Sequence, residues 1–312
     1  MYNYSLLLTN DVLTGDSMSD FRNLDVPDEA VAIHWFEQSS FAIKSRTGTT
    51  ILVDPYFPQE RPSDRFIYAQ PPVEEAEFPT DLVLLTHDHG DHTCVESLQR
   101  LENAWQPACY IGPIESLTRI SNDMEPSPQS NKDTSIQVSI DDKPIAGFSH
   151  SVLPSQKSVE AIAGQTIDCV LNDEKITIYP VYSKPPNGDS SADIDPPDVT
   201  HLGYVLDVSG VKIYISGDPI NNFADHDSLV QPILALQPDI GFLTTHPTEG
   251  EFPFFDGSLS MAQRLKLKHA VPTHRACFVT RDYDPQSWAN TFGKNDPTPL
   301  VMERNTHIVY PA

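Results

Sequence analysis

The chain has 312 residues, 39% of them hydrophobic, and can therefore bury a substantial core. Acidic residues outnumber basic ones by 44 to 20, and the formal charge of -24 argues against binding to nucleic acid or to an anionic membrane surface. A small anionic substrate is not excluded, because metal ions and local cations can reverse the potential inside a cleft. We expect one large domain, since α/β architectures often exceed about 200 residues as a single unit.

The sequence shows neither a membrane span nor a secretory signal. No apolar stretch approaches the roughly 18 residues of a spanning helix, and the N-terminus lacks a basic flank before a long apolar core. Four scattered cysteines form no CxxC pair, so we expect reduced thiols rather than disulfides. We therefore expect a cytoplasmic protein, and assembly into a homo-oligomer is left open.

The first predicted elements are three short strands at residues 30–36, 41–44 and 50–53. Each is a run of apolar, β-branched or aromatic residues, and turn residues separate the runs. This order predicts an antiparallel meander. Residues 1–29 are expected to be an N-terminal extension, and residues 30–312 are expected to form the domain.

A dense cluster of histidines and aspartates comes next. Thr86-His-Asp-His-Gly-Asp-His92 directly follows the apolar run 81–85, which we predict to be a strand. Beyond the cluster, Val95, Leu98 and Leu101 recur at a spacing of three and predict a helix over 95–103. The cluster therefore lies in a loop between a strand and a helix.

This loop has the composition of a metal site. His87 and His89 can project to one side, while Asp91 and His92 turn inward at the start of the next helix. Imidazole and carboxylate donors without thiolate suit Zn, Mn or Fe, and two such ions about 3.5–4 Å apart can share a bridging hydroxide. The H-x-H-x-D-H spacing favours this interpretation over a polar loop that is histidine-rich by chance.

Two polar, proline-bearing segments interrupt the rest of the chain. Residues 121–158 show no sustained period and are predicted to be a surface insertion, and residues 184–198 form a second such segment. The other predicted elements are helices over 228–236 and 258–268 and strands over 175–181, 201–207, 211–215, 239–243 and 270–273. Strands interleaved with helices in this order favour two packed sheets covered by helices.

Two further candidate ligands stand where predicted strands end. Asp218 follows the apolar run ending in Tyr214-Ile-Ser-Gly217, and His274 follows Ala270-Val-Pro-Thr273. Gly217 allows a close backbone approach at this point.

These pieces together resemble the metallo-β-lactamase superfamily, and within it the L-ascorbate-6-phosphate lactonase-like branch. The resemblance covers about residues 30–290 and includes, in the family's order, His34-Trp35 to Asp54-Pro55, Thr86 to His92, Ile111-Gly112-Pro113, Tyr214 to Asp218 and Val271 to His274. It implies a four-layer αβ/βα sandwich of two mixed sheets.

The resemblance also implies a set of metal ligands. They are His87 and His89 for a first ion, Asp91, His92 and His274 for a second, and Asp218 for both. Asp91 and Asp218 would also be the catalytic carboxylates, which orient the nucleophile and pass its proton to the leaving group.

The third ligand of the first ion departs from the family pattern. Many superfamily members place a histidine just after the strand represented here by 176–182, but this chain has Ser183 there. His201, which opens the next strand, is the expected substitute, within about 2.0–2.2 Å of the ion. The competing arrangement fills the site with Ser183, Tyr182 or water and leaves His201 outside it.

Other residues are weaker candidates. His246, Arg275 and Lys184 are candidates for substrate binding, although each fits an ordinary structural or surface role equally well. His150, in the insertion, is a weak candidate ligand. Cys94 is expected to be a buried thiol rather than a ligand.

Metal-assisted hydrolysis is the reaction that this ligand set favours. A metal ion lowers the pKa of bound water from 15.7 toward about 7 and stabilises the oxyanion formed on a small ester, lactone or phosphoester. The expected cofactors are one or two divalent ions, Zn first, with Mn or Fe as alternatives. A phosphodiesterase of a small nucleotide or lipid and a non-catalytic metal-binding protein remain as alternative functions. Specificity is expected in the loops 56–80, 184–200 and 246–257.

Overall fold

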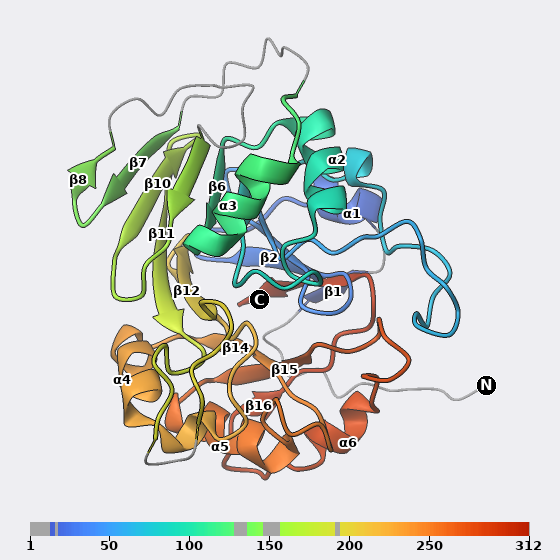
Figure 1. Cartoon of the computed structure of the whole chain (residues 1–312), viewed down its shortest axis with the longest axis vertical. Helices are drawn as coiled ribbons and strands as arrows, with labels where there is room; N and C mark the ends of the chain where they lie inside the picture. The colour runs from blue at the N-terminus through green and yellow to red at the C-terminus, as the bar shows by residue number, and fades with distance from the viewer. Residues whose placement is uncertain (1–12, 16–17, 128–135, 146–156, 191–193, 312) are drawn as a thin grey trace.

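Two mixed β-sheets form the centre of the protein, and helices cover the outer face of each (Figure 1). The computed structural model describes residues 13–15, 18–127, 136–145, 157–190 and 194–311. This is the expected four-layer arrangement of helices, sheet, sheet and helices.

The first sheet has eight strands in the order β1-β17-β2-β3-β4-β5-β6-β9. Their bounds are β1 Leu13–Gly15, β17 Thr306–Tyr310, β2 Val31–Trp35, β3 Phe41–Lys44, β4 Thr50–Val53, β5 Leu82–Leu84, β6 Cys109–Gly112 and β9 Ser158–Glu160. Strands β2, β3 and β4 pair antiparallel, which confirms the predicted meander. From β4 onward the pairing is parallel through β5 and β6 to β9.

The second sheet has nine strands in the order β16-β15-β14-β13-β12-β11-β10-β7-β8. Their bounds are β16 Thr298–Pro299, β15 His269–Thr273, β14 Ile240–Thr244, β13 Val211–Ile215, β12 Leu202–Val208, β11 Glu174–Tyr182, β10 Ile167–Leu171, β7 Gln137–Ile140 and β8 Lys143–Pro144. Strands β13 to β16 are parallel, and β12 pairs antiparallel with β13.

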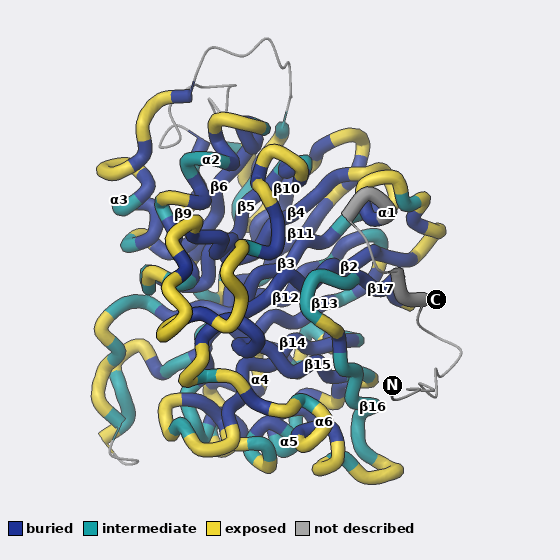
Figure 2. The backbone as a smooth tube through the Cα atoms, turned by 90° about the vertical axis from the view of Figure 1, so that its right-hand side faces the viewer, coloured by how far each residue is buried: buried dark blue, intermediate teal, exposed yellow. Residues whose placement is uncertain are grey.

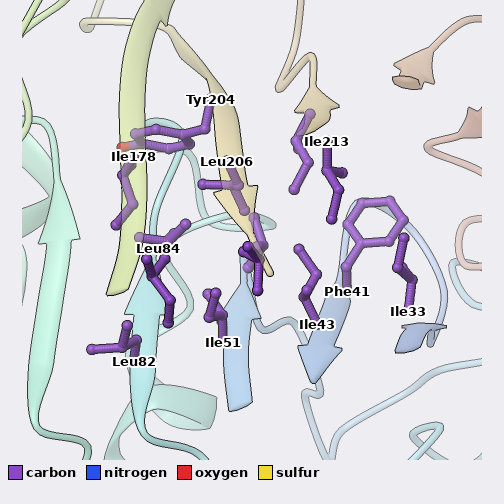
Figure 3. Close-up of a cluster of buried hydrophobic side chains, with 14 of the residues drawn as sticks. Ile33, Phe41, Ile43, Ile51, Leu82, Leu84, Ile178, Tyr204, Leu206 and Ile213 are labelled. Carbon is purple, nitrogen blue, oxygen red and sulfur yellow. The ribbon is translucent and has the colours of Figure 1, made fainter. Parts of the chain in front are cut away.

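The main hydrophobic core lies between the two sheets (Figure 3). Ile33, Ile43 and Leu84 of the first sheet meet Leu206 and Ile213 of the second. Because both faces of the central strands are covered, these strands are buried at nearly every position, as Figure 2 shows. Their sequences are therefore continuous apolar runs.

Helices fill the outer layers. The first sheet carries α1 Met18–Asn23, η1 Glu75–Glu77, α2 Val95–Trp105 and α3 Ile114–Asp123; the second carries η3 Phe223–Asp225, α4 Asp227–Leu236, α5 Phe255–Arg264 and α6 Pro285–Ala289. The predicted stripe of α2 is buried at Leu98 and Leu101. Helix α5 ends four residues earlier than predicted, because the chain turns at Lys266, with a φ of 54°, to enter β15. Among the described residues, no helix combines the length and apolar character that crossing a bilayer requires.

Two segments expected outside the sheets contribute strands to them. Strand β1, from the expected N-terminal extension, pairs with β17 at the edge of the first sheet. Strand β7, from the expected insertion, pairs with β10 in the second sheet. The proposed boundaries at residues 30, 121 and 158 remain predictions, but both segments take part in the sheets through backbone hydrogen bonds.

Candidate metal centre

The centre lies where several strands end at one edge of the two sheets. Parallel strands align their carboxyl ends, so the residues that follow β5, β13 and β15 emerge together. Thr86 and His87 follow β5, Asp218 follows β13, and His274 follows β15. Strand β12 runs antiparallel to β13, so His201 at its start reaches the same edge.

All seven candidate ligands meet there. Their donor atoms form three overlapping groups, and within each group the atoms lie within 4.8 Å of one another. The groups are His87, His89 and His201; His87, His92 and Asp218; and Asp91, His92 and His274. Because His87 and His92 each belong to two groups, the three form one continuous cluster.

Asp218 occupies the middle of this cluster. Its Oδ2 lies 3.6 Å from His87 Nε2, 3.4 Å from His92 Nε2 and 3.6 Å from His274 Nε2. Its side chain is almost completely buried. Burial opposes its charge, but the neighbouring His92 and His274 more than compensate and hold the pKa of Asp218 well below its usual range.

Hydrogen bonds fix which ring nitrogen of two histidines faces the centre. Thr86 Oγ1 donates its one hydrogen to Asp54 Oδ2 at 2.6 Å, so it accepts from His87 Nδ1 at 3.0 Å. His92 Nδ1 donates to Asp54 Oδ2 at 2.8 Å. In both rings Nε2 is left facing the cluster, which is the usual arrangement of a metal-binding histidine held by an outer partner.

Several buried polar atoms of the cluster have no hydrogen-bond partner. They are His87 Nε2, His92 Nε2, Asp218 Oδ1 and both ring nitrogens of His201. Leaving a buried polar atom unpaired costs about 1–3 kcal/mol, so unpaired atoms on four residues of one cluster call for a ligand, to which each ring offers one nitrogen. A divalent cation is such a ligand, and the donors are imidazole and carboxylate without thiolate, so the residues present fit Zn, Mn or Fe.

Burial keeps most of these imidazoles neutral. It lowers the pKa of His87 and of His274, and burial together with the charge of Lys184 lowers the pKa of His201 to about 3. His92 differs: burial lowers its pKa, but the Asp218 and Asp54 carboxylates outweigh burial and raise it. Neutral rings are the form that binds a metal, and a cation would displace the proton from His92.

His201 stands beside the first pair of histidines, while Ser183 is engaged elsewhere. The rings of His87 and His201 stack with centroids 4.2 Å apart. Ser183 Oγ donates a short hydrogen bond to the Ser216 carbonyl, and the Ser183 backbone N–H binds the His201 carbonyl at 3.1 Å. The Ser183 hydroxyl thus supports neighbouring backbone, and the His201 imidazole lies beside both His87 and His89.

Sequence reasoning missed three residues that touch the ligands. Asp54 directly follows β4, so its position at a strand end was a usable signal. Asp198, at the end of the loop 184–198, places Oδ2 3.0 Å from His89 Nε2 and Oδ1 3.7 Å from His201 Nε2. The third is Gln38, in the turn between β2 and β3, and nothing in its sequence context distinguishes it.

The three candidate substrate residues have other partners. Lys184 Nζ lies 3.3 Å from Glu251 Oε1. His246 Nδ1 accepts from the backbone N–H of Thr248 and Glu249. The Arg275 guanidinium is buried, bonds to the Met302 carbonyl and lies 4.3 Å from the centre of the Trp35 ring, so it is not a surface cation.

The remaining sequence candidates are Cys94 and His150. Cys94 is buried at the start of α2, where Ser97 Oγ donates to its Sγ at 3.4 Å, as a structural thiol would be. His150 lies outside the described residues.

A pocket of about 190 Å³ opens beside His201. Its wall is formed by Glu115 at the start of α3 and by the loop residues Pro186, Pro197, Asp198 and Thr200, with Tyr182 beneath. Thr200 is tied to Glu115 Oε1 through its backbone N–H at 3.2 Å and its hydroxyl at 2.9 Å. The second Glu115 oxygen is buried without a hydrogen-bond partner.

Known proteins of one superfamily resemble this chain. The family model described as "Beta-lactamase superfamily domain" matches residues 49–275. A UPF0173 metal-dependent hydrolase of Methanobrevibacter smithii is 24% identical over 275 residues, which cover 88% of this chain and 93% of that protein. Another, from Thermodesulfovibrio yellowstonii, is 38% identical over 65 residues, which cover 20% of this chain and 22% of that protein.

Among solved structures, Igni18, a metallo hydrolase of Ignicoccus hospitalis, superposes with a TM-score of 0.58 at 19% identity. The match covers 90% of this chain and 98% of Igni18. At this identity it shows the fold alone, which is the fold described above. The chain therefore belongs to the metallo-β-lactamase superfamily and is a metal-dependent hydrolase of that superfamily.

Proposed function

We propose that the cluster binds two divalent ions and that the protein hydrolyses a small carboxylic ester or lactone. The first ion would be held by His87, His89 and His201, the second by Asp91, His92 and His274, with Asp218 between them. The observation that carries this proposal is the set of buried, unpartnered donor atoms around Asp218. Zn is the first expectation for the metal, with Mn and Fe as alternatives.

The ions and the residues around them would have different roles in the reaction. When bound, such ions lower the pKa of a water toward neutrality and stabilise the negative charge that develops on the substrate oxygen. Asp54 and Thr86 hold the His87 and His92 rings in the required orientation. Asp91, which is half-buried, has a lowered pKa because the nearby His92 and His274 outweigh burial, so it is an ionised acceptor for a proton during the reaction.

The pocket beside His201 supports an uncharged or hydroxyl-bearing substrate. Two of its walls carry the carboxylates Glu115 and Asp198, which repel an anionic group and accept hydrogen bonds. Three described cations near the cluster are already paired: Lys184 with Glu251, Arg119 with Asp88 at 2.8 Å, and Arg281 with Glu249 at 3.0 Å. These pairings favour a neutral ester or lactone over a phosphorylated lactone or a phosphodiester.

Metal analysis and a substrate panel test the proposal. Elemental analysis of the purified protein should find one or two divalent ions per chain, and Asp91→Asn should lose metal and activity. Asp88→Asn is the matched control, because Asp88 belongs to the same motif but pairs with Arg119. The panel contains lactones, carboxylic esters and aryl phosphodiesters, and we expect turnover of the first two classes.

Each alternative has its own outcome. A protein with no bound or restorable metal would refute the metal centre. Bound metal with no turnover of any class would favour a non-catalytic role, and faster turnover of phosphodiesters would favour the phosphodiesterase alternative. We also propose a cytoplasmic location, which the four buried, unpaired thiols support.

A further inference from the structure

Gln38 is held rigidly against the segment that carries His274. Its backbone N–H donates to the Arg275 carbonyl at 2.9 Å, and its carbonyl accepts from the His274 N–H at 3.0 Å and from Trp35 Nε1 at 3.1 Å. Gln38 and His274 have φ angles of 54° and 64°, a left-handed conformation that is costly for residues other than glycine. Such conformations persist where the surrounding structure enforces them, often at functional sites.

The Gln38 side chain is fully buried and ends inside the metal centre. Its Nε2 lies 2.8 Å from Asp91 Oδ2 and 2.8 Å from His274 Nε2. Its Oε1 is buried and has no hydrogen-bond partner. The amide nitrogen thus donates its two hydrogens to two proposed metal ligands, and the amide oxygen accepts no hydrogen bond.

This arrangement is incompatible with an ion in the second site. By donating to His274 Nε2, the Gln38 amide occupies the lone pair that the ion needs. A half-turn of the carboxamide about its Cγ–Cδ bond exchanges Nε2 and Oε1 with little change of shape. The turn frees the His274 lone pair and directs the unused oxygen toward the same point.

The distances suit this second orientation. Adjacent ligands on one octahedral ion with bonds of about 2.1 Å lie about 3 Å apart, close to the 2.8 Å that separates the Gln38 amide from Asp91 Oδ2 and from His274 Nε2. Without an ion, the turned Oε1 would face the Asp91 carboxylate, oxygen against oxygen. A cation between them removes that repulsion, so the turn and ion binding favour each other.

We propose that Gln38 is a ligand of the second ion, through Oε1. The inference rests on the proposed two-ion centre. With Gln38, the second ion has five protein donors from Gln38, Asp91, His92, Asp218 and His274. For the second ion, a set of this size that includes a carbonyl oxygen favours six-coordinate Mn or Fe over tetrahedral Zn, in contrast to the Zn expected from the imidazole and carboxylate donors alone.

Two substitutions distinguish this role from a purely positioning one. Gln38→Leu removes both the oxygen donor and the N–H donor. Gln38→Glu keeps an oxygen donor but loses the N–H donor, and it places a carboxylate against Asp91. A ligand role therefore predicts that Gln38→Glu binds metal as well as the wild type does, and a role limited to holding Asp91 predicts that it fails like Gln38→Leu.

The experiment is a titration of the metal-free, full-length proteins with Mn²⁺, followed by paramagnetic resonance of free Mn²⁺. We expect Gln38→Leu to weaken one ion about 10–100-fold and spare the other, and Gln38→Glu to bind both at least as tightly as the wild type. Gln263→Leu is the control, because Gln263 bonds to Asp296 at the surface. A crystal structure with Mn²⁺ should then place Gln38 Oε1 about 2.1–2.3 Å from an ion.

Specific results would overturn the assignment. Unchanged affinity for every ion in Gln38→Leu would do so, as would loss of an ion in Gln38→Glu equal to that in Gln38→Leu. Circular dichroism separates either loss from unfolding, and if Gln38→Leu does not fold, Gln38→Glu and the crystal structure decide. A wild-type protein that binds no Mn²⁺, Zn²⁺ or Fe²⁺ would instead refute the two-ion centre itself.

Discussion

Replacing Asp54 by Asn should weaken metal binding, although Asp54 is not itself a proposed ligand. Asp54 Oδ2 accepts from Thr86 Oγ1 and from His92 Nδ1, and its Oδ1 accepts from the Thr86 backbone N–H at 2.8 Å. An asparagine side chain has one acceptor oxygen and one donor nitrogen. In either orientation, its NH₂ group therefore faces a hydrogen-bond donor, either the Thr86 backbone N–H or the Thr86 hydroxyl and His92 Nδ1. His92 can relieve the conflict by moving its proton to Nε2, but that blocks the nitrogen that faces the metal.

Two independent estimates give the same magnitude. An unsatisfied buried donor costs about 1–3 kcal/mol, and loss of an outer partner of a metal-binding histidine typically costs about 10–100-fold in metal affinity, or about 1.4–2.7 kcal/mol. We therefore expect the dissociation constant of the ion on His92 to rise about 10–100-fold in Asp54→Asn.

A competition titration against a chromophoric chelator measures this constant. Asp81→Asn is the matched control, since Asp81 accepts from the Thr50 N–H at 2.9 Å at the other end of β4. Wild-type affinity in a folded Asp54→Asn protein would refute the argument that Asp54 fixes the His92 tautomer.

Two further predictions concern other histidines. His201→Ala should lose one ion per chain by elemental analysis, because the Ser183 hydroxyl is bonded to Ser216 and cannot replace the imidazole; full occupancy with normal rates would contradict this. Burial lowers the pKa of His34 to about 4, so as pH falls the unfolded chain takes up this proton first, and stability is lost between about pH 6.5 and pH 4. The difference of about 2.5 pKa units corresponds to about 3 kcal/mol of unfolding free energy. Urea denaturation of the metal-free protein should therefore show that His34→Gln loses less stability than the wild type over this pH range. Equal losses would rule out His34 as the cause.

The fold was predictable because its strands are covered on both faces. Largely apolar runs of four to seven residues, such as β4 and β12, are typical of strands buried in this way. Most predicted bounds agree with the structure within two residues. Helix α5 is an exception, since it begins three residues and ends four residues before the predicted bounds. Strands β1 and β7 were not predicted, because they have little apolar periodicity and their place depends on backbone pairing with β17 and β10.

The local sequence by itself predicted a metal site and the residue types that would build it. Thr86 to His92 concentrates donors in seven positions, and Asp218 and His274 stand at strand ends, a pattern that does not depend on distant contacts. Only the tertiary structure decided what surrounds these donors. His201 reaches His87 through the antiparallel register of β12 on β13, and Gln38 reaches His274 through backbone bonds across 236 residues of sequence. Such partners are set by packing in three dimensions, which leaves no periodic trace in the sequence around them.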